Sequence, residues 1–129
     1  MYFLSSEKHI YKFSRDAAPA LTVKTGELVR LETMDCFSNQ IKAAEDKLES
    51  VQRGINPATG PIYVTGAEKG DTLKITVMEI KVSDRAVILA GKDMGLLGHK
   101  LEGKTIKVVP IINGELFFSE NIRLPLESM

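Results

Sequence analysis

The chain has 129 residues, 43% of them hydrophobic, and its 17 basic residues balance its 17 acidic residues. This length suits one domain, and the even charge argues against nucleic acid or an anionic membrane as a partner. No apolar run approaches the roughly 20 residues that cross a bilayer. The first residues do not resemble a secretory signal, and the single cysteine cannot form an internal disulfide. We therefore expect a cytoplasmic protein.

Short strands separated by glycine-centred turns predict a mainly β fold. After a first strand in residues 10–14, the turns Lys24–Gly26, Glu68–Asp71 and Asn113–Gly114 each lie between two strand patterns. Each turn predicts a hairpin, and Asn-Gly is the strongest signal because both residues tolerate positive φ. The expected strands are residues 20–23 and 27–33, 61–64 and 72–82, and 105–112 and 115–118. This spacing predicts a two-sheet sandwich, jelly-roll-like or barrel-like.

One segment has a helical rather than a strand pattern. Ile41, Ala44, Leu48 and Val51 follow one another at spacings of three and four residues. This periodicity predicts an amphipathic helix at about Ser38–Gln52, with Ser38 as its N-cap and a glycine shortly after its end. A short helix or a tight turn is expected at residues 94–97, between two glycines.

Asp35 is the first candidate for chemistry. If the strand that starts at Glu27 runs straight, Asp35 shares a face with Val29 and Leu31, which we expect to be buried. A carboxylate on such a face needs a partner, because an isolated buried charge is very costly. Two roles remain open: the carboxylate binds a metal or takes part in catalysis, or it accepts main-chain N–H groups in an Asx-turn.

Further polar candidates lie close to Asp35 in the sequence. The amides of Asn39 and Gln40 suit either the orientation of a polar substrate or hydrogen bonds at the entry of the helix. Cys36 belongs to no sequence motif with a histidine, which favours a small buried thiol. The two prolines of the bend at residues 56–61 make it rigid, as suits a loop that carries binding groups or a tight connection between strands.

Three segments together resemble the N-terminal half of the acetamidase/formamidase family of amide hydrolases. They are SRDAAPALTVKTGELVRLETMDCFSNQI at 14–41, NPATGPIYVTGAEKGDTLKITVMEI at 56–80 and MGLLG at 94–98. The string NPATGPIYVTGAEKGD at 56–71 is the most specific of these, and the resemblance runs from Ser14 to the last residue. It implies metal-assisted hydrolysis of short amides, such as acetamide and formamide, to a carboxylate and ammonia.

The resemblance also implies roles for single residues. Asp35 would be catalytic and would bind a divalent metal, with zinc and calcium both compatible, and Gln40 would assist it. The other metal ligands would come from outside this chain. Asp35 is expected to lie beside the bend at Asn56–Gly60. The residues expected to bind the small amide substrate are Asn39, Asn56, Thr59 and Gly60.

Family members are longer, and their second half carries His-Gly-Gly-like and Gly-Asp-Gly-Glu-like segments that this sequence lacks. Residues 1–129 are therefore expected to be the N-terminal portion of such a protein, inactive alone, and to form a homo-oligomer or to pair with a C-terminal half. The alternative is a non-catalytic β-sandwich module for binding or scaffolding, which Thr65 favours because family members commonly carry an acidic residue there. A carbohydrate-binding module is disfavoured, because aromatic residues amount to 6% and tryptophan is absent.

Overall fold

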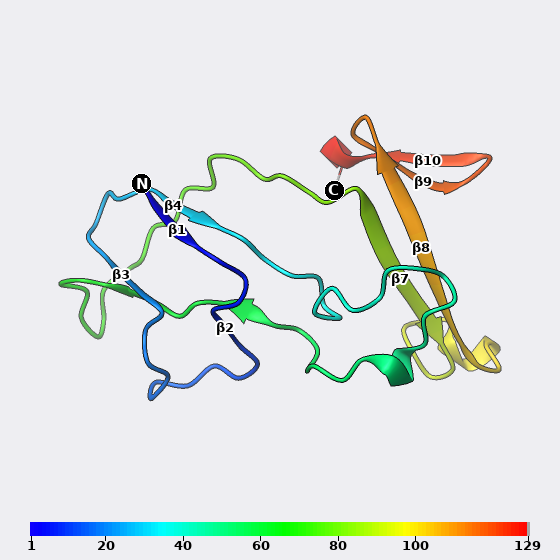
Figure 1. Ribbon diagram of the computed structural model, residues 1–129, viewed down its shortest axis with the longest axis horizontal. Coiled ribbons are helices and arrows are strands. Elements are labelled where there is room, and N and C mark those ends of the chain that lie inside the picture. The colour runs from blue at the N-terminus through cyan, green and yellow to red at the C-terminus, as the bar shows by residue number, and fades with distance from the viewer. Residues whose placement is uncertain (129) are drawn as a thin grey trace. The chain divides into compact units, whose positions relative to one another are not determined.

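The computed structural model describes residues 1–128 of the chain, which divide into two compact units. Unit 1 comprises Met1–Gln40 and Val51–Thr76. Unit 2 comprises Ile41–Ser50 and the residues from Val77 onwards. The chain is mainly β, as the sequence predicts, and its strands form several small sheets (Figure 1). Within the described range, no helix has both the length and the apolar character needed to span a membrane.

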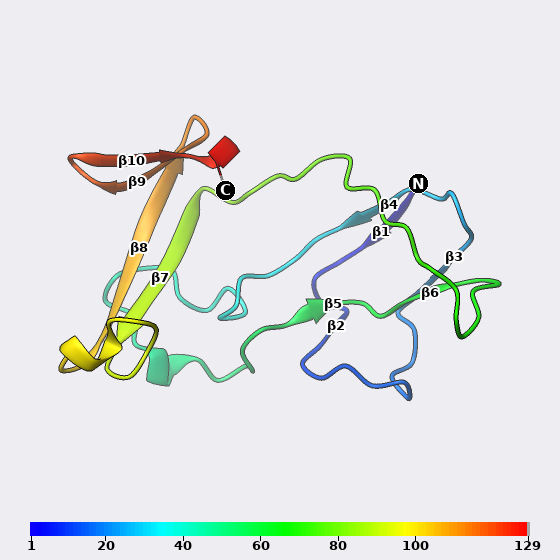
Figure 2. The same cartoon turned by 180° about the vertical axis from the view of Figure 1, so that it is seen from behind.

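Unit 1 consists of three two-stranded sheets, two parallel and one antiparallel. All three pairs can be followed from behind in Figure 2. The pairs are β1 (Tyr2–Leu4) with β4 (Val29–Leu31), β3 (Leu21–Val23) with β6 (Ile62–Val64), and, antiparallel, β2 (His9–Ile10) with β5 (Ala58–Thr59). Each sheet therefore joins segments that lie far apart in the sequence.

Unit 2 contains a four-stranded antiparallel sheet in the order β10-β9-β8-β7, so β7 lies at one edge. The turn between β8 and β9 has φ 50° at Asn113 and 78° at Gly114, which confirms the predicted hairpin. The predicted tight turn at residues 94–97 is also present. The elements of unit 2 are η1 (Leu48–Ser50), β7 (Arg85–Gly91), η2 (Gly98–Lys100), β8 (Lys104–Ile112), β9 (Glu115–Ser119), β10 (Ile122–Pro125) and η3 (Leu126–Ser128).

The other two predicted hairpins are wrong. The turn at Lys24–Gly26 forms, with φ 85° at Gly26, but β3 and β4 on either side of it pair with different strands. In the second case β6 forms, whereas residues 72–82 pair with no strand of the described chain. Strand propensity indicates which residues suit a pleated surface. It does not specify the partner strand, because main-chain N–H and C=O groups can pair with those of many different strands. The partner therefore cannot be read from the turn alone.

The predicted amphipathic helix at Ser38–Gln52 is also wrong: this segment forms turns and the single 3₁₀ turn η1. Ser38 and Asn39 have φ 56°, which an α-helix excludes. The Asp46 carboxylate accepts two main-chain N–H groups, three and four residues earlier, at 3.0 and 2.7 Å. Side chains of Ser, Asn and Asp compete with helical hydrogen bonds in this way. The apolar periodicity did not account for this competition.

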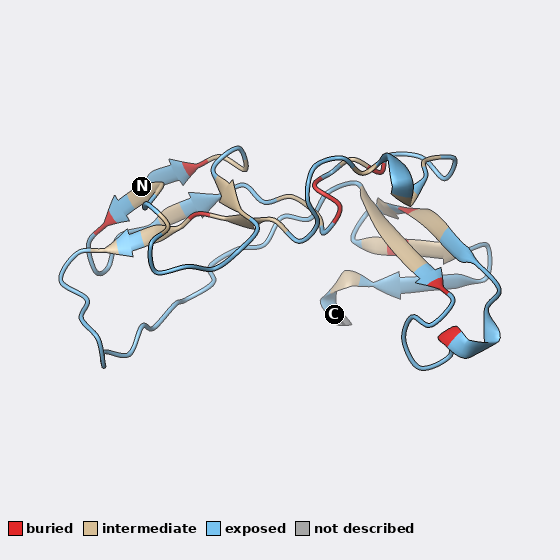
Figure 3. Cartoon of the chain, turned by 90° about the horizontal axis from the view of Figure 1, so that it is seen from below, coloured by how far each residue is buried: buried red, intermediate tan, exposed pale blue. Residues whose placement is uncertain are grey.

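The hydrophobic cores are small, and Figure 3 shows only short buried stretches on the ribbon. The two side chains buried most completely are Ile41 and Val109. The strands of residues 1–128 form four separate sheets, so the predicted two-sheet sandwich or barrel does not form among them. The buried hydrophobic residues are Leu4, Val23, Phe37, Ile41, Val109 and Leu116.

Candidate functional site

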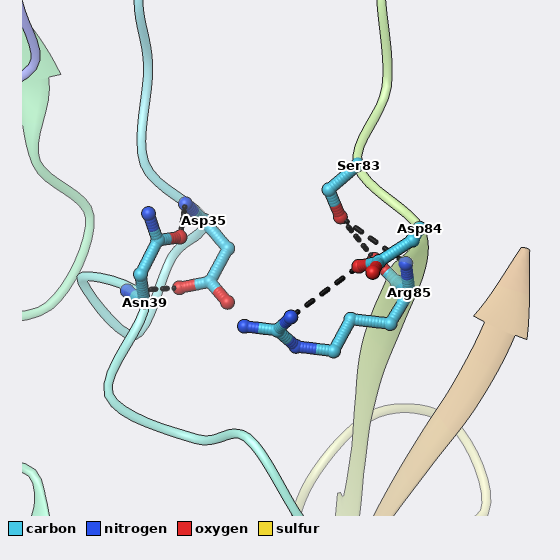
Figure 4. A network of polar contacts seen from close by, with 5 residues as sticks. All are labelled: Asp35, Asn39, Ser83, Asp84 and Arg85. Atoms are coloured by element: carbon cyan, nitrogen blue, oxygen red, sulfur yellow. Dashed lines mark hydrogen bonds and ion pairs between the residues drawn. The ribbon is translucent and has the colours of Figure 1, made fainter.

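Asp35 lies in a tight loop shortly after β4. Figure 4 shows its hydrogen bonds with Asn39. Oδ1 of Asp35 accepts the main-chain N–H of Phe37 at 2.9 Å and that of Asn39 at 2.8 Å. The Asp35 N–H donates in return to Oδ1 of Asn39 at 3.0 Å. The Asx-turn role is therefore confirmed for Oδ1. The other oxygen, Oδ2, accepts no hydrogen bond from residues 1–128, and Asp35 is half-buried.

Ser38 connects this loop to the chain that precedes the bend. It is 2% exposed, and its hydroxyl donates to the carbonyl of Gly54 at 2.6 Å. The phenol of Tyr11 lies 3.1 Å from the same hydroxyl oxygen. A buried hydroxyl with two partners is fully satisfied, so Ser38 holds the loop in place.

Gln40 uses its whole side-chain amide on the main chain. Its Oε1 accepts the N–H groups of Gln52 and Arg53, each at 3.0 Å. Its Nε2 donates to the carbonyls of Phe37 at 2.9 Å and Arg53 at 3.2 Å. Two acceptor sites and two donors are all that this amide has. The geometry gives Gln40 a positioning role, and its catalytic role stays a prediction.

The bend at Asn56–Gly60 lies directly beside the Asp35 loop. The Asn56 N–H donates to the carbonyl of Cys36 at 2.8 Å. The Thr59 hydroxyl donates to the carbonyl of Glu32 at 2.8 Å, and β5 pairs Thr59 with His9. The predicted neighbourhood of Asp35 and this bend is therefore confirmed.

The other predicted binding residues differ in what they can offer a ligand. Asn39 and Asn56 are exposed, and within the described chain the Nδ2 of Asn39 and the whole amide of Asn56 have no hydrogen-bond partner. Thr59 is half-buried, with its hydroxyl already donating. Gly60 is buried with φ 130°, a backbone conformation that favours glycine. Binding groups are therefore free on Asn39 and Asn56, whereas Gly60 shapes the bend.

Two ionisable groups close to Asp35 in the sequence, Glu32 and Cys36, have perturbed pKa values. Cys36 is exposed, so the prediction of a buried thiol is wrong. Partial burial, and after it the negative charge of Asp35, still raise the pKa of the Cys36 thiol. Hydrogen bonds from the main chain and hydroxyl of Ser6 and from the hydroxyl of Ser5 lower the pKa of Glu32. Sequence reasoning missed Glu32, because its partners are 26 and 27 residues away and no local motif signals them.

The described residues do not form a metal site with three or more carboxylate, imidazole or thiol ligands. Zinc sites take three or four protein ligands, and Asp35 Oδ2 offers a single oxygen. A cleft in unit 2, lined by residues 44–49 and 104–106, contains none of the predicted site residues. The chain's own side chains therefore do not fit a complete metal centre.

Comparison with known proteins finds similarity to one protein family. Residues 5–114 match the model of the Acetamidase/Formamidase family. A recombinant predicted acetamidase/formamidase from the thermophile Thermoanaerobacter tengcongensis has a TM-score of 0.92 and 47% identity, over 96% of this chain and 42% of its own. Acetamidase from Bacillus halodurans has a TM-score of 0.90 and 40% identity, over 95% of this chain and 42% of its own.

A more distant structure shares the fold. Acetamidase from Yersinia enterocolitica has a TM-score of 0.71 and 22% identity, over 96% of this chain and 42% of its own. No match was found among curated proteins. The chain thus spans less than half the length of each of these three solved structures.

Proposed function

The chain belongs to the acetamidase/formamidase family, and on this basis we propose that it forms part of a hydrolase of short aliphatic amides. The products are a carboxylate and ammonia. Because the chain covers 42% of the solved relatives, we place only one wall of the site in it. The remaining groups come from polypeptide outside the match.

The observation that carries this proposal is the hydrogen bond from the Asn56 N–H to the Cys36 carbonyl. It holds two segments of the family resemblance against each other. Three groups with unused hydrogen-bonding capacity then lie on neighbouring stretches of chain: Oδ2 of Asp35 and the amides of Asn39 and Asn56. A substrate amide has one acceptor oxygen and an NH₂ donor, which side-chain amides complement.

Each of these groups has a proposed part in hydrolysis. Water must lose a proton as its oxygen attacks the amide carbon, and the departing nitrogen must gain one. Asp35 Oδ2 is the acceptor that orients the attacking water. Asn39 and Asn56 bind the substrate amide, and Thr59 and Gly60 shape the wall beside it. Gln40 positions the loop that carries Asp35.

A divalent cation such as zinc or calcium belongs to the proposal only with ligands from outside residues 1–128, because Asp35 supplies one oxygen. Such a cation, when bound, polarises the amide carbonyl and lowers the pKa of its water. The positions of Asp35, Asn39 and Asn56 do not depend on it, since main-chain hydrogen bonds hold their loop and bend.

The test compares this chain with a joined protein, in which the chain replaces its matched counterpart in the Thermoanaerobacter tengcongensis relative. Ammonia release from formamide and acetamide is measured for both. We expect release by the joined protein and none above the blank by the chain alone. A joined protein that folds and releases no ammonia from either amide contradicts the proposal and leaves the non-catalytic module as the explanation.

A further inference from the structure

Strand β7 exposes one side of its main chain at the edge of the unit 2 sheet. The Ile111 N–H donates to the Asp84 carbonyl at 2.7 Å, and the Lys92 N–H donates to the Gly103 carbonyl at 3.0 Å. These bonds fix the alternation: even-numbered residues of β7 bond to β8, and odd-numbered residues point their N–H and C=O groups away. This alternation agrees with the position of Arg85 opposite Pro110, because proline has no N–H to donate.

The outward-pointing N–H and C=O groups of β7 differ in whether they have a hydrogen-bond partner. The Ser83 hydroxyl donates to the Arg85 carbonyl at 2.6 Å and lies 3.3 Å from the Arg85 N–H, as Figure 4 shows. The outward N–H groups of Val87 and Leu89 have no such partner within the described chain. An unpaired row of this kind is a template for a further strand.

The segment that leads into β7 is exposed along its whole length. Residues 77–82 form an extended trace before β7 in Figure 1 and belong to no strand. Met78, Ile80 and Val82 alternate with Glu79 and Lys81, so an extended chain places the three apolar side chains on one face. Ile80 is 78% exposed. Contiguous exposed apolar side chains mark an interaction site.

We propose that residues 77–82, together with the outward edge of β7 at Val87 and Leu89, bind an extended segment of complementary polypeptide; we call these residues the docking edge. The occupant is the part of the family fold that this chain does not match, and it adds a strand through its main chain. Its side chains that face Met78, Ile80 and Val82 are apolar.

The comparisons favour this occupant over a second copy of the chain. The backbone of this chain superposes on that of the Thermoanaerobacter tengcongensis protein with a TM-score of 0.92. The match covers only 42% of the length of that protein. That relative therefore contains further polypeptide, which we propose as the segment that covers this edge. The inference rests on family membership and does not depend on amide hydrolysis, so a binding measurement tests it independently of ammonia release.

The test uses this chain and, as the probe, the polypeptide of the Thermoanaerobacter tengcongensis protein outside the match. Calorimetry measures the dissociation constant, and hydrogen exchange measures protection of the Val87 and Leu89 amides. We expect binding, with both amides protected in the complex. Val87→Pro removes one outward N–H and no bond to β8, so it weakens binding about tenfold. Val87→Thr keeps the N–H and the side-chain shape and leaves binding unchanged.

A second pair of variants does not depend on tolerance of proline in β7. Ile80→Lys places a charge on the docking edge, whereas Leu96→Lys makes the same change at a side chain that is 92% exposed in a turn. We expect Ile80→Lys to weaken binding about tenfold or more and Leu96→Lys to leave it unchanged. Equal binding by the two variants overturns the proposal, as does absence of binding by the unmodified chain. If the unmodified chain forms dimers and Val87→Pro dissociates them, the occupant is a second copy of the chain. That result also overturns the proposal.

Discussion

Asp35 shows how one side chain can organise a loop and still present a free oxygen. Oδ1 accepts two main-chain N–H groups, and Oδ2 remains without a partner among residues 1–128. The sequence left both roles open, and the structure shows that the Asx-turn does not use the whole carboxylate. Three of the four hydrogen bonds of Gln40 were not predictable, because two of them reach 13 residues along the chain and one reaches 12.

Cys36 gives a direct readout of the charge on Asp35. Burial and the Asp35 carboxylate both raise the pKa of the thiol. Removal of the negative charge makes the thiolate easier to form, so Asp35→Asn lowers the pKa of Cys36 while burial still holds it above the usual value. The pH dependence of iodoacetamide alkylation measures this change.

Asp16→Asn is the matched control, because Asp16 is exposed and, within residues 1–128, its carboxylate forms only an ion pair with its neighbour Arg15. We expect its alkylation profile to coincide with that of the unmodified chain. A profile for Asp35→Asn that also coincides with it would show that Asp35 does not lie beside the thiol as described.

The sequence patterns predicted correctly one strand pair, whose two strands are neighbours in the sequence. The Asn113–Gly114 turn specifies its own hairpin, because both strands adjoin the turn and their register follows from it. The same argument failed at Lys24–Gly26, whose neighbouring strands pair in parallel with β1 and β6. The helix predicted at residues 38–52 failed because side chains bond the main chain there, which apolar spacing does not reveal.

Gln40 offers a test of the segment that replaces the predicted helix. Gln40→Ala leaves the N–H groups of Gln52 and Arg53 without their acceptor, so we expect it to lower the free energy of unfolding by about 1 kcal/mol. Urea unfolding measures the loss. Gln52→Ala serves as the control, because the Gln52 side chain makes no hydrogen bond within residues 1–128. Equal stability of the two variants would argue against the role of Gln40 in holding this segment.

At the scale of the whole molecule, the family could be recognised from sequence whereas the arrangement of the strands could not. The string at residues 56–71 identified the acetamidase/formamidase family, which the match over residues 5–114 confirms. A sandwich needs sheets that share a core, but the described strands form four separate sheets and residues 72–82 remain unpaired. Pairing partners that lie outside a chain leave no signal within it. We propose the docking edge as the place where such a partner binds.

We propose that Asp35 acts in amide hydrolysis as well as in holding its loop. The most direct test is the rate of ammonia release from acetamide by the joined protein carrying Asp35→Asn, compared with the same protein carrying Asp16→Asn. Asparagine keeps an acceptor oxygen for the N–H groups of Phe37 and Asn39 but removes the charge. We predict a rate about a hundredfold lower for Asp35→Asn and an unchanged rate for Asp16→Asn. Equal rates for the two variants would contradict the claim.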